Sequence, residues 1–551
     1  MFNKNNILSR NGIRDQKTAA WLMAEAPFFE CPDPVFERLW YYRWSVVFRH
    51  LVYVPEIGGH IFTEFESDGP LYWAGPFNSI VGASDHHVNE ARWLRSQRYA
   101  QEYLRFWLTH EPAQRQNYSA ALADSVWAAY CAQGDARLPL DLLDALVANH
   151  DCWRKEHVDY PHDRGHDAAS GLFWNTGRNS TGEYNLPSAQ LNEPLRGIQG
   201  YKIRGGAGYR PDINADMFAD MAAISRIARL AGRPDLADDY ARRARALQRE
   251  AHARLWDPGR EFFMHRWLRD EYSEGDRHGS PSIRAGSLLW ETNADRHGGI
   301  GHQPHERGEG KGRELTGYLP WYRHMPEDTP VLAEAWRFLL DPEYFYAPYG
   351  PTTAERHDPW FSIQYDCRLN GNSFPLNTSR VLNGAANLLH DYRHHGAMTP
   401  RAYFDLLGIY ARTQYRDGEP YLAEMHHPDQ DHWVVDRPIG AHYFHSSFCD
   451  LVITGLLGVR ARPDNTLRIS PLLPAGAWDY FALLDLPWHG RLVTVLWDRT
   501  GKKYGRRGLR VLIDNIEQSH SPELDAALIQ FGEAAAASAN ANQPAKTVEA
   551  V

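Results

Sequence analysis

The stretch DINADMFADMAAISRIARLA, residues 212–231, decides the fold. Its apolar side chains return every three or four positions, which predicts a helix with one buried face. Those side chains are Ile213, Met217, Met221, Ile224 and Ala228. Gly232 closes this helix and Pro234 prevents it from continuing. Because Asp235–Leu255 follows as an antiparallel partner, the stretch predicts a helical hairpin.

The same pattern predicts helices along most of the chain. They are expected at Asp33–Leu51, His86–Trp107, Tyr118–Ala132, Leu138–Asn149, Pro330–Leu340, Leu376–Arg393, Pro400–Thr413 and Phe448–Leu457. The total is about ten to twelve helices in consecutive pairs, and the polar loops between them alternate in length. This arrangement is typical of a mainly α protein built as an α/α toroid, whose long loops gather at one mouth. Since strands do not alternate with helices, a Rossmann or TIM architecture is disfavoured.

The sequence pattern changes after Arg462. Short β-rich segments follow, separated by Gly and Pro turns, and they predict a small β-rich appendage. These segments are Thr466–Leu472, Phe481–Leu486, Leu492–Trp497 and Leu509–Ile513. We therefore expect four parts: an N-terminal arm at 1–30, the α/α barrel at 31–462, the appendage at 463–516 and a tail at 517–551. The end of the chain is rich in Ala, Asn and Gln, which predicts that the tail is disordered.

Composition narrows the class of protein. The chain is 43% hydrophobic and 13% aromatic, and its net charge is −10. The negative charge argues against nucleic acid or an anionic membrane as a partner. The 19 Trp and 28 Tyr suit two roles, as core filler or as platforms for sugar rings. No stretch reaches membrane-spanning length and the start has no apolar run typical of a secretory signal, so we expect a cytoplasmic protein. A periplasmic location stays open if a leader has been removed.

The five cysteines, Cys31, Cys131, Cys152, Cys367 and Cys449, are widely spaced and form no CxxC pair. Neither a zinc ribbon nor a disulfide framework is indicated. We expect no metal and no cofactor. The sequence does not indicate an oligomeric state.

The segment Tyr421–Leu457 carries the first candidate for catalysis. It places the carboxylate of Glu424 in a polar loop that is rich in His and Pro, after a helix and among aromatic residues. A helical barrel presents a catalytic base to a sugar in this way. The alternative is a surface turn in which the carboxylate is merely solvated.

Three further loops offer groups for binding and cleaving a sugar. Gly171–Asn185 offers a second acid, Glu183, and Asp366–Pro375 and Leu71–Phe77 offer polar and aromatic groups. These groups are Arg368, Asn370, Asn372, Tyr72 and Trp73. An inverting glycosidase needs a general acid and a general base roughly 6.5–9.5 Å apart. Two acids distant in sequence, on loops at one mouth of a barrel, fit that requirement, so Glu183 and Glu424 are the candidate pair.

An insertion at Arg266–Arg313 has no apolar period and contains His278, His297, His302 and His305. It fits an active-site lid, a metal site or a mobile loop. The histidines lack HxH or HxxxH spacing and a partner Cys, which speaks against a metal. Loops of this length in compact domains are often functional, which favours a lid over a metal site.

Taken together, the motifs resemble the helical-barrel glycoside hydrolases related to family 63 and to mannosylglycerate hydrolase. The resemblance runs from about Asp33 to Asn515 and rests on the GEY turn at Gly182–Tyr184 and on six longer motifs. Those motifs are GYRPDINADMFADMAAISRIARLAG (208–232), RELTGYLPWY (313–322), APYGPTTAERHDP (347–359), LNGNSFP (369–375), AEMHHPDQDHW (423–433) and YFHSSFCDLVITGLLGVRAR (443–462).

The resemblance implies an (α/α)6 toroid of six helical hairpins and an inverting mechanism. It also implies that Glu183 is the general acid and Glu424 the general base. Within or beside the matched motifs, Tyr184, Arg210, Trp321, Trp433 and His445 join the five residues named above as the expected substrate contacts.

The chain departs from the family pattern in three places. The first acid is Glu where the best-known members more often have Asp. An extra stretch, Leu186–Ala207, follows it and makes Glu193 a fallback. The segment Leu369–Pro375 lacks two Trp that the family usually has there, which bears on sugar specificity more than on chemistry.

The sequence thus predicts an exo-acting, inverting glycoside hydrolase for small oligosaccharides or glycosides, because added loops narrow a barrel mouth. Two alternatives stay open. A glycoside phosphorylase of the same superfamily would lack the base, and a non-catalytic sugar-binding protein would tolerate loss of either acid. The sequence does not indicate which sugar is bound.

Overall fold

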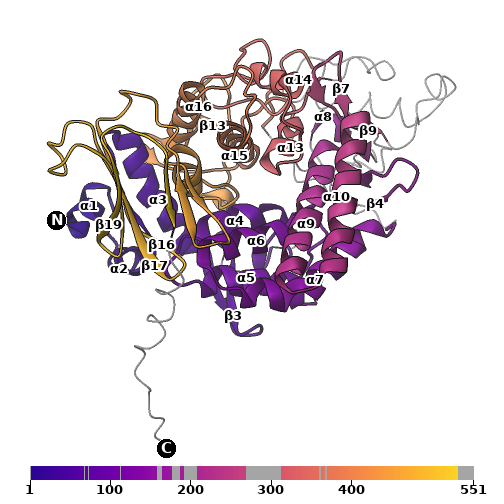
Figure 1. Ribbon diagram of the computed structural model, residues 1–551. Helices are drawn as coiled ribbons and strands as arrows, with labels where there is room; N and C mark the ends of the chain where they lie inside the picture. The colour runs from indigo at the N-terminus through magenta and orange to yellow at the C-terminus, as the bar shows by residue number, and fades with distance from the viewer. Residues whose placement is uncertain are drawn as a thin grey trace, which may run out of the picture.

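A computed structural model describes residues 2–67, 69–71, 74–111, 113–157, 164–175, 186–190, 208–267, 312–358, 361–365 and 369–530. Helices make up the body of the molecule, and the C-terminal strands lie beside helices α1 to α3 (Figure 1). The expected mainly helical fold with a β-rich C-terminal part is confirmed.

One layer of helices surrounds the centre of the molecule (Figure 1). Contacts run from α4 to α6, α9, α13, α15 and the π-helix η7 in turn. The main chain before η7 returns to α4, because Glu90 accepts hydrogen bonds from the N–H groups of Phe448 (2.6 Å) and Cys449 (3.0 Å). These inner helices are α4 (Ser84–Ala91), α6 (Leu122–Gln133), α9 (Pro211–Leu230), α13 (Leu319–Tyr322), α15 (Pro375–Asp391) and η7 (Leu451–Leu456).

A second set of helices alternates with the inner set along the chain. Its members are α3 (Pro34–His50), α5 (Arg98–Thr109), α7 (Arg137–Arg154), α10 (Pro234–Leu255), α14 (Pro330–Ala333) and α16 (Pro400–Thr413). The opening stretch of the sequence is confirmed as a hairpin, since α9 packs along α10. Asp33 caps α3 by accepting from the Val35 N–H at 2.9 Å, and Pro34 occupies the first turn.

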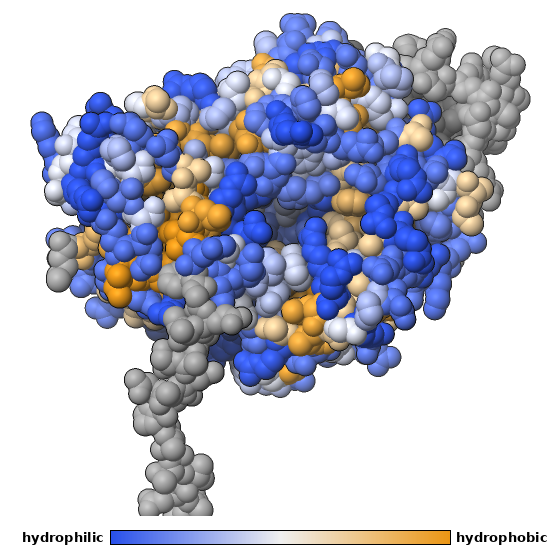
Figure 2. All heavy atoms as spheres, in the orientation of Figure 1, coloured by the Kyte–Doolittle hydropathy of each residue, from blue (hydrophilic) through white to orange (hydrophobic). Residues whose placement is uncertain are grey.

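The connections between these helices alternate in length. Those that follow an inner helix are short, at residues 92–97, 134–136, 231–233, 323–329 and 392–399. Those that precede an inner helix are long, at residues 51–83, 110–121, 155–210, 256–314, 338–374 and 414–450. Because paired helices run antiparallel, the long connections share one end, which we call the mouth. Figure 2 shows a hollow at the centre of the face in view, rimmed mainly by hydrophilic residues.

The C-terminal part is a five-stranded sheet in the order β1-β16-β17-β18-β19, antiparallel throughout. Its strands are β1 (Phe28–Glu30), β16 (Tyr480–Trp488), β17 (Arg491–Asp498), β18 (Gly508–Ile513) and β19 (Ile516–Ser521). β1 comes from the N-terminal arm, which also forms α1 (Lys4–Arg10) and α2 (Gln16–Glu25). A three-stranded sheet joins β14 (Val459–Ala461), β15 (Thr466–Ile469) and β20 (Ala527–Gln530).

Three expectations are corrected. The helix expected at 86–107 is two helices, α4 and α5. The chain between them is held in a non-helical conformation because Glu25 accepts hydrogen bonds from the Ser96 N–H (2.9 Å) and the Ser96 hydroxyl (2.7 Å). The helix expected near 448–457 is a π-helix, with the Leu457 N–H donating to the Val452 carbonyl at 2.8 Å. The chain from 517 to 530 forms β19 and β20 where disorder was expected, since main-chain pairing orders a stretch whose side chains are mostly exposed. Residues 531–551 lie outside the described residues.

Most of the tryptophans in the described parts serve the core. Eight of them are among the largest fully buried side chains, namely Trp40, Trp44, Trp93, Trp107, Trp153, Trp321, Trp336 and Trp488. Cys31, Cys131, Cys152 and Cys449 are free thiols, whereas Cys367 lies outside the described residues. In the same parts of the chain, no helix has both the length and the apolar character needed to cross a membrane.

Candidate active site

Segments from three long connections lie side by side at the mouth. Isolated antiparallel bridges join Glu314 to Ala354, Thr352 to Ser373, and Ser373 to His426. The last of these residues belongs to β12 (Met425–His426), which pairs with β13 (Trp433–Val435). This ladder fixes the loop that carries Glu424 against the loop that carries Asn370 and Asn372.

The main chain at Glu424 is anchored where its N–H donates to the Val435 carbonyl at 3.1 Å. Its side chain is 17% exposed, and its Oε2 lies 3.8 Å from a guanidinium nitrogen of Arg437. The predicted base is therefore a partly buried carboxylate at the mouth, with a positive charge beside it. A neighbouring cation favours the charged form of a carboxylate, which is the form a general base needs.

His445 is buried directly behind the Glu424 loop. Its ring stacks on Tyr443 with centroids 4.0 Å apart, and the ring of Phe374 is tilted against it with centroids 5.3 Å apart. Burial lowers the pKa of His445 to about 3, although hydrogen bonding to the carbonyls of Tyr443 and Glu424 opposes the shift. The imidazole is thus neutral at ordinary pH, and its Nε2 makes no hydrogen bond within the described part of the chain. His445 supports the Glu424 loop, while its expected contact with a sugar stays a prediction.

A second buried histidine lies next to Glu424 in the chain. His426 stacks on Tyr349 (5.4 Å) and meets the edge of Trp433 (5.0 Å). Burial lowers the pKa of His426 to about 4. Trp433 is 8% exposed, so the indole mainly packs this loop, and its expected role at the substrate stays a prediction.

Asn372 stabilises the loop that precedes α15, which lies beside the Glu424 loop. Its side chain accepts from the Gln364 N–H (2.9 Å) and donates to the Gln364 carbonyl (2.8 Å). Asn370 is completely buried. Both residues lie beside the Glu424 loop, and their expected contacts with sugar hydroxyls stay predictions.

Arg210 precedes α9 and belongs to a buried polar group that also contains Ser188 and Glu314. The N–H and hydroxyl of Ser188 donate to the two carboxylate oxygens of Glu314, at 2.7 and 2.9 Å, and Arg210 donates to the Ser188 hydroxyl. Burial raises the pKa of Glu314 and lowers that of Arg210. The group ties α8 (Pro187–Gln190) to the segment before α13. Glu314 lies in the motif RELTGYLPWY, but its role depends on contacts that the sequence does not display.

Four inner helices are joined by a buried charge network that the sequence did not reveal. Asp85 accepts two hydrogen bonds from Arg380, at 2.8 and 3.1 Å, and a third from Arg323 at 3.1 Å. Arg323 also donates to Asp216 at 2.8 Å. Burial would raise the pKa of Asp85, but the guanidiniums of Arg380 and Arg323 hold it well below its usual range.

Residues 76–446 match the family model of the mannosylglycerate hydrolase MGH1-like glycoside hydrolase domain. The match covers most of the chain. The chain belongs to the MGH1-like glycoside hydrolase family. This confirms the predicted relationship to helical-barrel glycosidases, which act on glycosidic bonds. Residues 460–516 also match the C-terminal domain of glycosyl hydrolase family 65.

Similar solved structures support the same fold. A structure described as a sialidase shares 27% identity at a TM-score of 0.78, covering 96% of this chain and 44% of its own. A family 78 rhamnosidase of Bacillus sp. GL1 shares 12% identity at a TM-score of 0.53, covering 89% of this chain and 42% of its own. The MGH1-like chain therefore spans less than half the length of these two relatives.

Trp321, a predicted sugar contact of the MGH1-like domain, lies in the core. Trp321 is only 1% exposed and packs edge-on between Phe263 (5.5 Å) and Trp336 (5.5 Å). Both partners belong to the hydrophobic core, and the expected contact of Trp321 with a sugar stays a prediction.

Five predicted site residues lie outside the described residues, namely Tyr72, Trp73, Glu183, Tyr184 and Arg368. The fallback acid Glu193 and the histidines of the 266–313 insertion lie outside them as well. In the parts of the MGH1-like chain that the structure describes, no three His, Cys, Asp or Glu side chains converge as a metal site would need.

Proposed function

We propose that this MGH1-like protein hydrolyses terminal glycosidic bonds of small oligosaccharides or glycosides with inversion of the anomeric centre. Glu424 is the general base that activates water, and Glu183 is the general acid that protonates the leaving oxygen. The observation that carries the proposal is the position of Glu424, a partly buried carboxylate at the mouth.

We infer that the inner helices close into the (α/α)6 toroid expected from the sequence. The contacts from α4 around to η7, and the hydrogen bonds from Phe448 and Cys449 back to Glu90, support a closed ring of six hairpins. Such a ring gathers the loops of distant segments at one mouth, as a two-acid mechanism requires. In this proposal residues 31–462 carry the activity and residues 463–516 form an appendage.

We further propose that the enzyme is exo-acting. Several chain segments converge at the mouth, and a crowded mouth makes a pocket that admits a chain end. An endo-enzyme would need an open cleft along which a polymer can lie.

The test is a screen of aryl glycosides and oligosaccharides, followed by proton NMR of the product released first. α-Sialosides belong in the screen, because the similar structure at 27% identity is described as a sialidase. We expect a monosaccharide or disaccharide whose anomeric configuration is opposite to that of the substrate. Early release of internal fragments would contradict exo action, and retained configuration would contradict inversion.

A glycoside phosphorylase is the second candidate, favoured by the match of residues 460–516 to a family 65 C-terminal domain. A phosphorylase uses phosphate as its nucleophile and needs no general base. Glu424 in the position of a base therefore favours the hydrolase. Turnover that depends on added phosphate and yields a sugar phosphate would establish the phosphorylase.

A further inference from the structure

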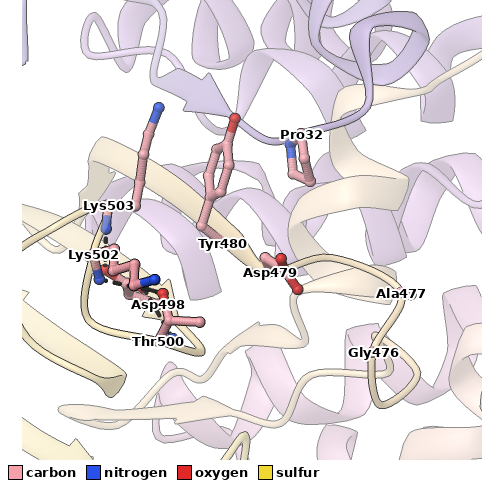
Figure 3. Close-up of a pocket in the computed structure, with 9 residues that line it drawn as sticks. All are labelled: Pro32, Gly476, Ala477, Asp479, Tyr480, Asp498, Thr500, Lys502 and Lys503. Carbon is pink, nitrogen blue, oxygen red and sulfur yellow. Dashed lines mark hydrogen bonds between the residues drawn. The ribbon is translucent and has the colours of Figure 1, made fainter.

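A cleft lined by charged and apolar groups opens between Pro32, just before α3, and the C-terminal sheet (Figure 3). It has a volume of about 590 Å³, which is within the range of sites for small ligands. Pro32 lines one side, and the other sides come from the connections before β16 and between β17 and β18. The lining residues that matter here are Pro32, Asp479, Tyr480, Asp498, Lys502 and Lys503.

One aromatic ring stands in this cleft in a fixed orientation. Tyr480 opens β16 and pairs with Asp498 of β17. The Lys503 ammonium lies 4.3 Å from the centroid of the ring, and the ring of Tyr504 meets it at 90° with centroids 6.0 Å apart. Figure 3 shows Tyr480 standing between Lys503 and Pro32. Tyr480 lines the cleft, and an aromatic ring in such a position offers a surface on which the C–H face of a sugar can pack.

Hydrogen bonds within the protein hold the polar side of the cleft in place. The Asp498 carboxylate accepts hydrogen bonds from four main-chain N–H groups, at 2.6 to 3.2 Å. Lys503 donates to Glu30 at 2.8 Å, and Arg499 donates to Asp479 at 2.7 Å. A ligand that binds here does not need to order the loop first, so little binding energy is lost.

The charges that line the cleft cancel, because two aspartates face two lysines. A balanced lining of donors and acceptors beside one aromatic ring suits a neutral, polyhydroxylated ligand better than a polyanion or a polycation. Among the described residues Lys502 has no acidic partner in an ion pair, so its ammonium is available to donate to hydroxyl groups.

The cleft is remote from the mouth. Pro32 precedes the first turn of α3, whose other end leads into the long connection at 51–83. α3 has 17 residues, so its two ends are roughly 25 Å apart at 1.5 Å per residue. The cleft and the mouth therefore lie toward opposite ends of α3.

We propose that this cleft is a second, non-catalytic carbohydrate-binding site, in which a neutral oligosaccharide stacks on Tyr480 and is held by Asp479 and Lys502. The class of ligand rests on the proposed glycosidase function. The site holds a carbohydrate on the protein while the mouth acts on chain ends.

A glycan microarray of plant, fungal and bacterial oligosaccharides tests the site. The full chain carries Glu424→Gln, so that bound glycans are not consumed. We compare it with the same chain carrying Tyr480→Ala, and with a matched control carrying Tyr53→Ala, which removes a ring that is 55% exposed elsewhere. Lys502→Ala is a milder second variant, and melting temperatures confirm that each variant is folded.

We expect Tyr480→Ala and Lys502→Ala to lower binding of at least one neutral glycan tenfold or more, while Tyr53→Ala leaves it unchanged. In a chain that keeps its native Glu424, the rate of hydrolysis of a small aryl glycoside should be the same with and without Tyr480→Ala. A binding pattern that Tyr480→Ala does not alter, or no bound glycan at all, would overturn the second site. The hydrolysis assay reports on the proposed function separately, so the two can fail independently.

Discussion

The guanidinium of Arg437 lies 3.8 Å from the carboxylate of Glu424, and the arginine is 53% exposed whereas the glutamate is 17% exposed. Arg437→Gln removes the positive charge that favours the ionised carboxylate. The base then takes up a proton more readily, so the acidic limb of the pH–rate profile should move to higher pH. Solvent keeps the shift small, because the Arg437 side chain is half exposed.

The profile of kcat/KM against pH measures this shift. Arg416→Gln is the matched control, because Arg416 lies nearby in the chain but pairs with Asp436 at 2.8 Å. An acidic limb that stays in place in Arg437→Gln, or that moves equally in Arg416→Gln, would show that this pair does not set the charge of Glu424.

The buried network at Asp85 should matter for stability. Asp85→Asn leaves the guanidiniums of Arg380 and Arg323 without their shared carboxylate in a dry interior. Breaking a buried ion pair in this way costs about 3–5 kcal/mol of unfolding free energy. Denaturant titration measures it. Asp238→Asn is the control, since its pair with Arg229 is exposed on both sides and should contribute within about 1 kcal/mol. Equal effects of the two substitutions would contradict the network.

Acid should destabilise the fold through histidines that are buried in the neutral form. Burial lowers the pKa of His50, His150 and His445 to about 3, from an ordinary value of 6.5. Between those values the unfolded chain binds more protons than the folded chain, so stability falls as pH falls from 6.5. Each group contributes about 1.4 kcal/mol per pH unit in that window.

Four buried carboxyls act in the opposite direction, namely Glu90, Asp216, Asp220 and Glu314, because burial raises the pKa of each. Burial raises the pKa of Glu90 to about 7 and that of Asp216 to about 6, so both favour the folded chain as pH falls. The histidines outnumber them, because burial also lowers the pKa of four others to about 4, namely His87, His390, His426 and His442. We therefore expect the melting temperature to drop between pH 6 and pH 4. His150→Phe should reduce the drop, because neither ring nitrogen of His150 has a hydrogen bond to lose in the described structure. His357→Gln, at an exposed site, should leave it unchanged. A melting temperature that rises towards pH 4 would contradict this assignment.

The helical fold could be predicted because its signals are local. The period of apolar residues in α9 and the Gly232–Pro234 stop define a hairpin without reference to the rest of the chain. The split between α4 and α5 could not be predicted, since it depends on hydrogen bonds from Ser96 to Glu25, which is distant in sequence. β19 escaped prediction because its side chains are mostly exposed and polar, so only main-chain pairing marks it as a strand.

The candidate site likewise contains residues that the sequence identifies and residues that it does not. Glu424 could be found because an acid in an aromatic loop is visible in the sequence and lies in a family motif. The roles of Glu314 and Asp85 could not be found, because each depends on partners brought together from other helices. The burial of Trp321 could not be predicted, since the sequence shows an aromatic residue but not the direction of its ring.

The rate of Glu424→Gln on the glycoside that the parent protein cleaves fastest tests the central claim most directly. Glu419→Gln is the matched control, because that carboxylate is exposed and pairs with Arg38. We predict that kcat/KM of Glu424→Gln falls by roughly 10²–10⁴-fold, while its melting temperature and sugar binding stay those of the parent. A rate within about tenfold of the parent would contradict the assignment of Glu424 as the general base.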